Sequence, residues 1–257
     1  MVRKFIILLI SVLFISSLVR AEVTPGTKKS MSLGNSITEI KLGESTVQLE
    51  VIRRGRGPVF VALHENESTA ITAAKKLLSK SGGTLIILRH GGDRNVTFAL
   101  SGVMYNFDPN RIFTIEGIRR TLKGGSSREA ITAVRSLAQV ILSEIGNRPI
   151  IALHNNTNGG YSLASYVSGG KYARDALLVH RESVQDIDNF FFTTEKRLFV
   201  AAKQKKFNVV LQSGIAADDG SLSVYSFEHG LRYVNVEAEH GSAVTQFIML
   251  TWLSHNW

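Results

Sequence analysis

Short apolar runs alternate with segments of helical periodicity along most of this chain, and this alternation limits the fold more than any other feature. Several runs are continuous in Val, Ile and Leu, which is typical of strands buried on both faces of a parallel or mixed sheet. The expected strands are 46–52, 58–63, 84–88, 149–153, 176–179, 207–211 and 231–236, and the expected helices are 68–81, 128–145, 194–205 and 241–253. We therefore predict an α/β three-layer sandwich, in which a mixed, mostly parallel sheet is covered by helices on both faces.

Side chains that bind metals or transfer protons stand at the ends of three of these strands. One strand is followed by His64 and Glu67, a second by His154, and a third leads into Glu237 and Glu239. In open α/β sheets, ligands gather at the carboxyl ends of the strands. We therefore expect these side chains to meet at one edge of the sheet.

His64, Glu67 and His154 form a candidate metal site. Catalytic zinc takes nitrogen and oxygen ligands in near-tetrahedral geometry, with three ligands from the protein and one open position. The spacing HxxE is common by itself, and the alternative for Glu67 is a first-turn carboxylate favoured by the helix dipole. His90 is a rival third ligand and His240 a weaker one. Manganese, cobalt and nickel also accept such ligands.

The run FDPNRIF holds a second candidate site at Asn110 and Arg111. The planar fork of arginine binds a carboxylate through two hydrogen bonds, and an adjacent amide can complete the contact. This pair therefore suits the anionic end of a substrate. The alternative is a plain turn, because the sequence from Asp108 to Asn110 is good turn chemistry in any protein.

Together these motifs resemble the zinc carboxypeptidases and the related aspartoacylase and succinylglutamate desuccinylase group. The matching runs are HENE, DPNRIF, ALHNN and VNVEAEHG, which follow the order of that family and cover most of the chain. The resemblance implies that His64, Glu67 and His154 bind one zinc ion. It also implies that the Asn-Arg pair binds the substrate carboxylate and that Glu237 activates water, with Glu239 as the alternative base.

Two substrate-side groups of that family have no firm match in this chain. The arginine that polarises the scissile carbonyl has only a loose counterpart, for which we expect Arg94, with Arg89 as the runner-up. Either arginine has an alternative role in an ordinary salt bridge. The tyrosine that contacts the substrate in carboxypeptidases is left open between Tyr161, Tyr225 and Tyr233.

The N-terminus predicts export. Residues 1–21 hold a basic start, an apolar run and a small-residue site, which is the pattern of a secretory signal peptide, and an uncleaved membrane anchor is the alternative. Residues 22–42 are expected to be loosely structured and residues 43–257 to form one catalytic domain. We expect a periplasmic or secreted protein with no stable membrane span after cleavage. The chain has no cysteine, which excludes disulfides and cysteine chemistry.

Charge and motifs lead to one expected function and two alternatives. The net charge of +9 falls to +6 without residues 1–21, which hold three basic residues and no acidic one. This charge favours anionic partners, but no basic run interleaved with aromatics indicates nucleic acid. The expected function is a zinc metallocarboxypeptidase that cleaves an amide bond next to a free carboxylate, with cell-wall peptidoglycan peptides as candidate substrates. The alternatives are an N-acyl amino acid deacylase and a non-catalytic module that binds peptide or glycan ends.

Overall fold

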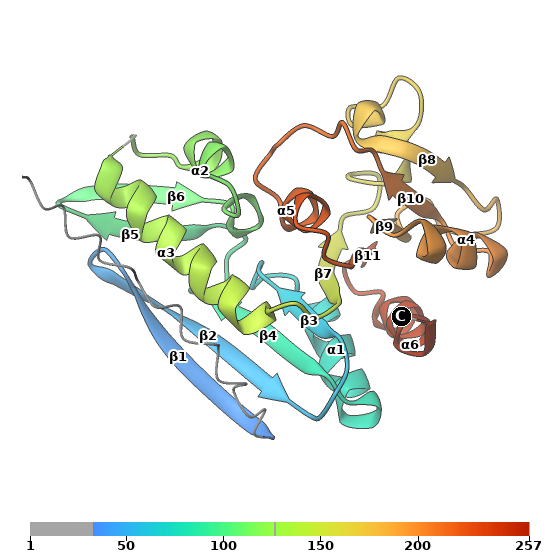
Figure 1. The fold of residues 1–257 in the computed structure, drawn as a ribbon, viewed down its shortest axis with the longest axis horizontal. Helices are drawn as coiled ribbons and strands as arrows, with labels where there is room; N and C mark the ends of the chain where they lie inside the picture. Colours follow the sequence, from blue (N-terminus) through green and yellow to red (C-terminus); the bar gives the residue numbers. More distant parts are fainter. Residues whose placement is uncertain (1–32, 126, 257) are drawn as a thin grey trace, which may run out of the picture. The chain divides into compact units, whose positions relative to one another are not determined.

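The structure is a computed structural model that describes residues 33–125 and 127–256. A nine-stranded mixed sheet runs through this part of the chain (Figure 1). Its strands are β1 (Gly34–Leu42), β2 (Ser45–Arg53), β3 (Val59–Ala62), β4 (Thr84–Arg89), β7 (Ile150–Asn156), β8 (Ala176–His180), β9 (Phe190–Thr193), β10 (Val209–Gln212) and β11 (Tyr233–Glu239). They are ordered β1-β2-β4-β3-β7-β11-β9-β10-β8. The signal peptide predicted for residues 1–21 lies outside the described residues.

The centre of the sheet is parallel and its outer parts contain antiparallel pairs. Strands β4, β3, β7 and β11 are parallel neighbours. The pairs β1–β2, β2–β4 and β8–β10 are antiparallel. Every residue of β3 is buried, as expected for an apolar strand covered on both faces. The predicted mixed sheet with a parallel core is therefore confirmed.

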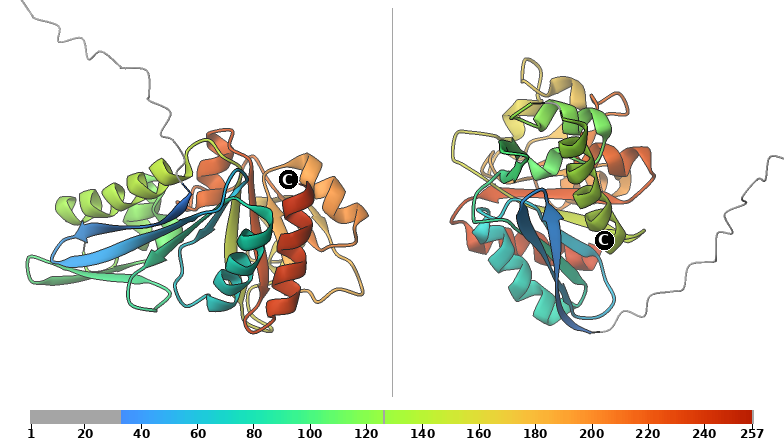
Figure 2. Two further views of the ribbon diagram at one scale, coloured as in Figure 1. Left: turned by 90° about the horizontal axis from the view of Figure 1, so that it is seen from below. Right: turned by 90° about the vertical axis from the view of Figure 1, so that its left-hand side faces the viewer.

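Helices cover both faces of the sheet, which confirms the predicted three layers. One face carries α1 (Ser68–Ser81), α4 (Lys196–Gln204) and α6 (Ala243–Asn256), and these helices share one apolar cluster with the sheet. The other face carries α2 (Ile115–Thr121), α3 (Arg128–Ile145), α5 (Leu222–Glu228) and a hairpin of β5 (Val96–Leu100) and β6 (Val103–Phe107). Helices α1 and α6 lie side by side (Figure 2).

The longest helix shows why the local sequence folds in this way. Helix α3 begins after Ser127, whose hydroxyl oxygen accepts a hydrogen bond from the backbone N–H of Ala130 at 3.0 Å. Its residues Val134, Leu137 and Ile141 recur at helical spacing and are fully buried against the sheet. The apolar stripe thus sets the face on which the helix packs.

Strand β1 corrects one sequence expectation. Loose structure was expected over 22–42, but Gly34–Leu42 pair with β2 in continuous antiparallel register. Only Ile40 and Leu42 of this strand are buried, so its sequence carries almost no apolar pattern. Backbone hydrogen bonds to β2 order the strand instead. Within the described residues, no helix is long and apolar enough to cross a bilayer.

Candidate metal centre and active site

Three neighbouring strands bring the predicted metal ligands and base to one edge of the sheet. His64 follows β3, and Glu67 is the residue that precedes the first turn of α1. His154 lies in β7 and is the direct neighbour of Glu237 in β11 in the parallel register. Strands β3, β7 and β11 are adjacent and parallel, so their carboxyl ends meet at one edge of the sheet. These four residues therefore lie together at that edge, as predicted.

The three predicted ligands point at one another. Nδ1 of His64 lies 3.0 Å from Oε1 of Glu67 and 3.3 Å from Nδ1 of His154. Nδ1 of His154 lies 3.0 Å from Oε2 of Glu67. All three side chains are buried, and their ligand atoms lie within 4.8 Å of one another.

This arrangement fits a tetrahedral metal ion. Ligand atoms about 2.0–2.1 Å from a tetrahedral zinc ion lie about 3.3 Å apart, close to the spacings between the nitrogen and oxygen atoms here. Oε2 of Glu67 is buried, and apart from its ion-pair contact with Nδ1 of His154 it has no hydrogen-bond partner among the described residues. A bound cation would satisfy this oxygen, since buried polar atoms are nearly always paired. The donor set of two imidazoles and one carboxylate is also typical of catalytic zinc.

Asp108 orients His64, although the sequence indicates only a turn at this position. The Nε2–H of His64 donates to Oδ1 of Asp108 at 2.7 Å, which leaves Nδ1 to face the other two ligands. Carboxylates behind a metal-binding histidine set its tautomer in this way. Burial acts to lower the pKa of His64, but the hydrogen bonds to Asp108 and Glu67 raise it to about 9. The metal-free site therefore binds a proton that a metal ion would displace.

Arg94 lies beside the metal site, whereas Arg89 does not. Nη1 of Arg94 donates to Oε1 of Glu67 at 2.7 Å, and Arg94 lines the adjacent cavity. Arg89 pairs instead with Glu50 of β2, at 2.7 Å between Nη2 and Oε2. Of the two arginines, only Arg94 therefore contacts a predicted metal ligand.

The loop that carries Arg94 is anchored by Glu65. One oxygen of this carboxylate, Oε2, accepts hydrogen bonds from the backbone N–H groups of His90, Gly91 and Gly92 at 2.6, 2.9 and 2.9 Å. Burial acts to raise the pKa of Glu65, but these three donors hold it below its ordinary value. Glu65 stands between the two HxxE ligands in sequence, so one short segment fixes both the metal site and the arginine loop. No sequence pattern indicates this role.

Asn110 and Arg111 form a short 3-10 turn, η1 (Pro109–Arg111), that lines the same cavity. Oδ1 of Asp108 accepts from the backbone N–H of Asn110 at 2.8 Å, so one carboxylate both caps this turn and orients His64. The guanidinium of Arg111 is ion-paired with Asp219. The predicted carboxylate-binding pair is therefore brought to the metal site, with Arg111 held by an acidic partner.

A close contact between two glycines brings the loop that carries Asp219 against this turn. A Cβ atom on Gly117 of α2 would lie 2.2 Å from the Cα of Gly220, so any larger residue would push the loop away. Gly220 has a φ of +76°, which favours glycine for a second reason. The backbone N–H of Phe113 donates to the carbonyl oxygen of Gly220 at 3.0 Å. The two loops thus form one continuous wall.

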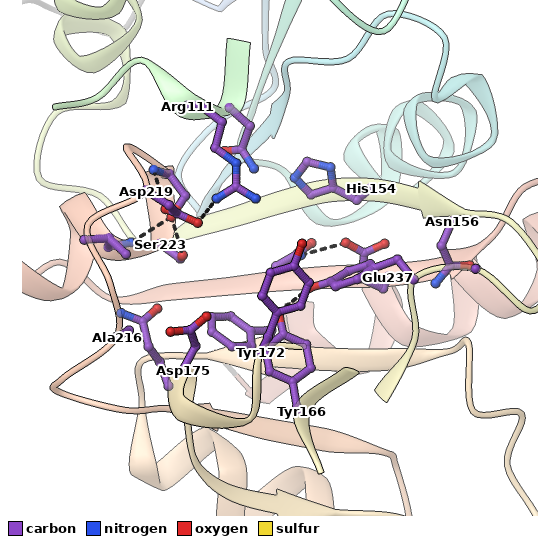
Figure 3. A pocket seen from close by; sticks show the side chains of 18 of the residues that line it. Arg111, His154, Asn156, Tyr166, Tyr172, Asp175, Ala216, Asp219, Ser223 and Glu237 are labelled. Carbon is purple, nitrogen blue, oxygen red and sulfur yellow. Dashed lines mark hydrogen bonds and ion pairs between the residues drawn. The ribbon is translucent and has the colours of Figure 1, made fainter. Parts of the chain in front are cut away.

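The residues of this site enclose a cavity of about 380 Å³. In the view of Figure 3, Arg111 and Asp219 lie on one side of the cavity, and Tyr172 and Asp175 lie on the other. Two of its buried amides, Gln212 and Asn235, keep a side-chain oxygen without a hydrogen-bond partner among the described residues. This volume suits a small ligand or the end of a peptide.

Glu237 is, beside Glu67, a buried carboxyl group that lines the cavity. Burial raises its pKa to about 7, against the opposing charge of His154. Its Oε1 accepts a hydrogen bond from Nδ2 of Asn235 at 2.9 Å. A carboxyl group with a pKa near neutrality suits general-base catalysis. Glu239 is partly exposed and does not line the cavity, so the geometry favours Glu237 as the base.

The remaining sequence candidates lie elsewhere, with one exception. His90 and His240 are not members of the ligand group, and His240 is exposed. Tyr225 stacks on His229, with ring centroids 3.9 Å apart, and Tyr233 is almost fully buried. Tyr161 does line the cavity, and so do Tyr166 and Tyr172, which the sequence did not single out.

Comparisons with known proteins find likeness in structure only. No protein-family model and no curated protein sequence matches this chain. The solved structures that resemble it include a succinylglutamate desuccinylase/aspartoacylase from Rhodobacter sphaeroides (TM-score 0.45, 13% identity, 87% of this chain and 66% of that one). Others are the ectoine utilization protein EutE (DoeB) from Ruegeria pomeroyi (0.43, 14%, 84% and 68%) and an aspartoacylase family protein from Mesorhizobium loti (0.42, 14%, 85% and 67%).

The likeness to these solved structures is weak, with TM-scores of 0.42–0.45, and no family is assigned from it. The chain spans slightly less than two thirds of the length of the first of them. What the site does is inferred from its own residues.

Proposed function

We propose that this protein is a metal-dependent hydrolase that cleaves an amide bond next to a free carboxylate, with zinc as the expected metal. One observation carries the proposal, namely the buried convergence of His64, Glu67 and His154 at spacings of 3.0–3.3 Å. Glu237 and Arg94 line the cavity that opens beside this group. When bound, zinc supplies Lewis-acid chemistry and makes a water molecule acidic near neutral pH.

The side chains of this cavity divide the remaining tasks. Glu237 takes the proton of the attacking water and later delivers it to the leaving amine nitrogen. Arg94 stabilises the negative charge that develops on the carbonyl oxygen. Asn110 and Arg111 bind the free carboxylate of the substrate and so orient the bond that is cut. Asp219 holds the Arg111 guanidinium in the cavity until the substrate carboxylate replaces or joins it.

The cavity also indicates which substrate residue it accepts. Asp175, Gln212 and Asn235 line it, and the buried oxygens of the two amides have no donor among the described residues. Hydrogen-bond acceptors that lack donors are best satisfied by a substrate that brings N–H groups. We therefore expect a substrate whose C-terminal residue carries an amino group on its side chain. The variant Asp175→Asn should then reduce kcat/KM for peptides ending in lysine at least fivefold more than for peptides ending in leucine.

Of the possible activities, we propose that of a metallocarboxypeptidase first, because the cavity offers hydrogen-bond acceptors for the terminal side chain as well as the pair that binds the carboxylate. The N-acyl amino acid deacylase and the non-catalytic binding module are the other outcomes of the test. Export, and cell-wall peptides as the natural substrate, rest on the sequence of residues 1–21 and remain proposals.

The test combines metal content with turnover. Protein loaded with zinc would be assayed against peptides with a free C-terminus, muropeptides and N-acyl amino acids, beside His64→Ala and His154→Ala. We expect about one zinc per chain in the wild type, loss of zinc in both variants and release of C-terminal residues from peptides. Turnover of N-acyl amino acids alone would establish the deacylase. Zinc binding without any turnover would leave the binding module, and zinc binding that is indifferent to both histidines would refute the site.

A further inference from the structure

The layer formed by α1, α4 and α6 is strongly basic. These three helices contain no acidic residue, whereas α2, α3 and α5 on the opposite face contain four basic and four acidic residues. Eight exposed cations lie in this layer or directly after α4, and one of them, Lys75, is ion-paired with Glu50. The other seven are Lys76, Lys80, Lys196, Arg197, Lys203, Lys205 and Lys206. None of the seven has an ion pair within the described residues. We call them the seven layer cations.

An apolar stripe lies among these cations. Helix α6 has no Lys, Arg, Asp or Glu, and it leaves Val244 at 75% and Ile248 at 54% exposure. Val200 on α4 is also exposed, at 44%. The outer side of α6 is therefore suited to contact with another apolar medium.

Cations lie near α6 on two neighbouring segments, helix α1 and the segment that follows α4. On the α1 side, the Nζ atoms of Lys76 and Lys80 lie 4.9 and 5.8 Å from the ring centroid of Phe247. On the α4 side, the ring of Trp252 lies 5.1 Å from that of Phe207, which directly follows Lys205 and Lys206. An apolar stripe bordered by lysines is the arrangement of helices that lie in the surface of an anionic bilayer.

We propose that this face docks on the surface of an anionic lipid bilayer. The seven layer cations would attract acidic headgroups, and Val244, Ile248 and Val200 would enter the boundary between headgroups and acyl chains. A second copy of the chain fits less well, because it would bring seven cations against seven. An anionic polymer would account for the cations but not for the apolar stripe.

Docking through this face would leave the active site open. No residue of α1, α4 or α6 lines the cavity, whose walls come from the strand ends, their loops and α5. A substrate in the surrounding solution would thus reach the metal site while the protein is on the membrane. The proposal does not depend on the proposed hydrolase activity.

The test measures binding of the full chain to vesicles by sedimentation. Vesicles of pure phosphatidylcholine are compared with vesicles that contain 30% phosphatidylglycerol, and the apolar run within residues 1–21 is present in every variant and so cancels. We expect at least tenfold tighter binding to the anionic vesicles, weakened by added salt. Changing Lys76, Lys80, Lys205 and Lys206 to glutamine should remove most of this preference.

Two matched variants separate docking from bulk charge and from self-association. The first variant removes the same charge from the opposite layer and should change binding less than twofold. It replaces four arginines by glutamine, namely Arg119, Arg120, Arg128 and Arg135. The double variant Val244→Ser/Ile248→Ser keeps the charge and should weaken binding to anionic vesicles at least fivefold, without affecting binding to soluble polyglutamate.

Four results would overturn the proposal. The first is equal binding of the wild type to both vesicle types, and the second is an equal loss in the arginine control. The third is an unchanged serine variant, which would point to a polyanion surface instead. If the serine substitutions convert a dimer to a monomer in analytical ultracentrifugation, the face is a contact between copies and the membrane proposal is wrong. Thermal denaturation shows that each variant remains folded.

Discussion

Replacement of Asp108 by asparagine is the sharpest perturbation of the metal site, because it keeps the shape of the side chain and removes only its charge. In the structure, Oδ1 of Asp108 accepts from Nε2–H of His64 at 2.7 Å, and the His64 side chain is fully buried. A neutral amide is a weaker acceptor, and its N–H₂ group would favour the wrong tautomer of His64. The variant therefore makes it less favourable for His64 to hold its proton on Nε2 and keep Nδ1 free to bind the metal.

Two independent estimates give the size of the effect. Loss of a carboxylate behind a metal-binding histidine typically lowers metal affinity by about 10–100-fold, which corresponds to about 1.4–2.7 kcal/mol. A hydrogen bond to a charged group contributes about 1.5–3 kcal/mol to stability, which is the same range. We therefore expect Asp108→Asn to raise the zinc dissociation constant by about 10–100-fold at pH 7.5.

The assay is competition between the metal-free protein and a chromophoric zinc chelator. Glu65→Gln is the matched control, because Glu65 is also a partly buried carboxylate near the site but contacts no ligand atom. A dissociation constant of Asp108→Asn within twofold of the wild type would refute the role given to Asp108. An equal loss in the control would show that the effect is general destabilisation.

Three further predictions concern the base, the arginine loop and pH. Glu237→Gln should lower kcat by at least a hundredfold and leave zinc affinity within threefold, and competitive titration beside steady-state assays checks both; retained turnover, with loss in Glu239→Gln, would transfer the role of base to Glu239. Glu65→Gln should lower kcat several-fold without altering zinc affinity, because it frees the loop that carries Arg94, and an unchanged kcat would contradict this positioning role. With a chelator present, the free energy of unfolding should fall as pH rises from about 6 to 9.5. The pKa of Glu237, raised by burial to about 7 from 4.5, and that of His64, raised to about 9 from 6.5, both favour the protonated folded state at low pH. Melting curves recorded across this pH range test the direction of the change in stability. The variant His64→Gln should flatten the dependence at the upper end of the range. A stability that rises with pH would refute this prediction.

The layers of this fold could be read from local patterns. Continuous apolar runs such as β3 and β7 identified the central strands, and the stripe of Val134, Leu137 and Ile141 identified α3. Strand β1 could not be predicted, because it is ordered by backbone pairing with β2 and buries only two side chains. Strand β9 was not predicted either, whereas β3 and β10, which also have four residues, were.

For the site, the sequence alone determined which residue types stand at the strand ends, and so His64, Glu67, His154 and Glu237 could be named as candidates. Their convergence was decided by the tertiary structure, because the order of β3, β7 and β11 in the sheet is set by packing between distant segments. The same holds for Asp108 behind His64 and for Glu65 beneath the arginine loop. These are contacts between loops, where hydrogen bonds across tens of residues leave no periodic trace in the sequence.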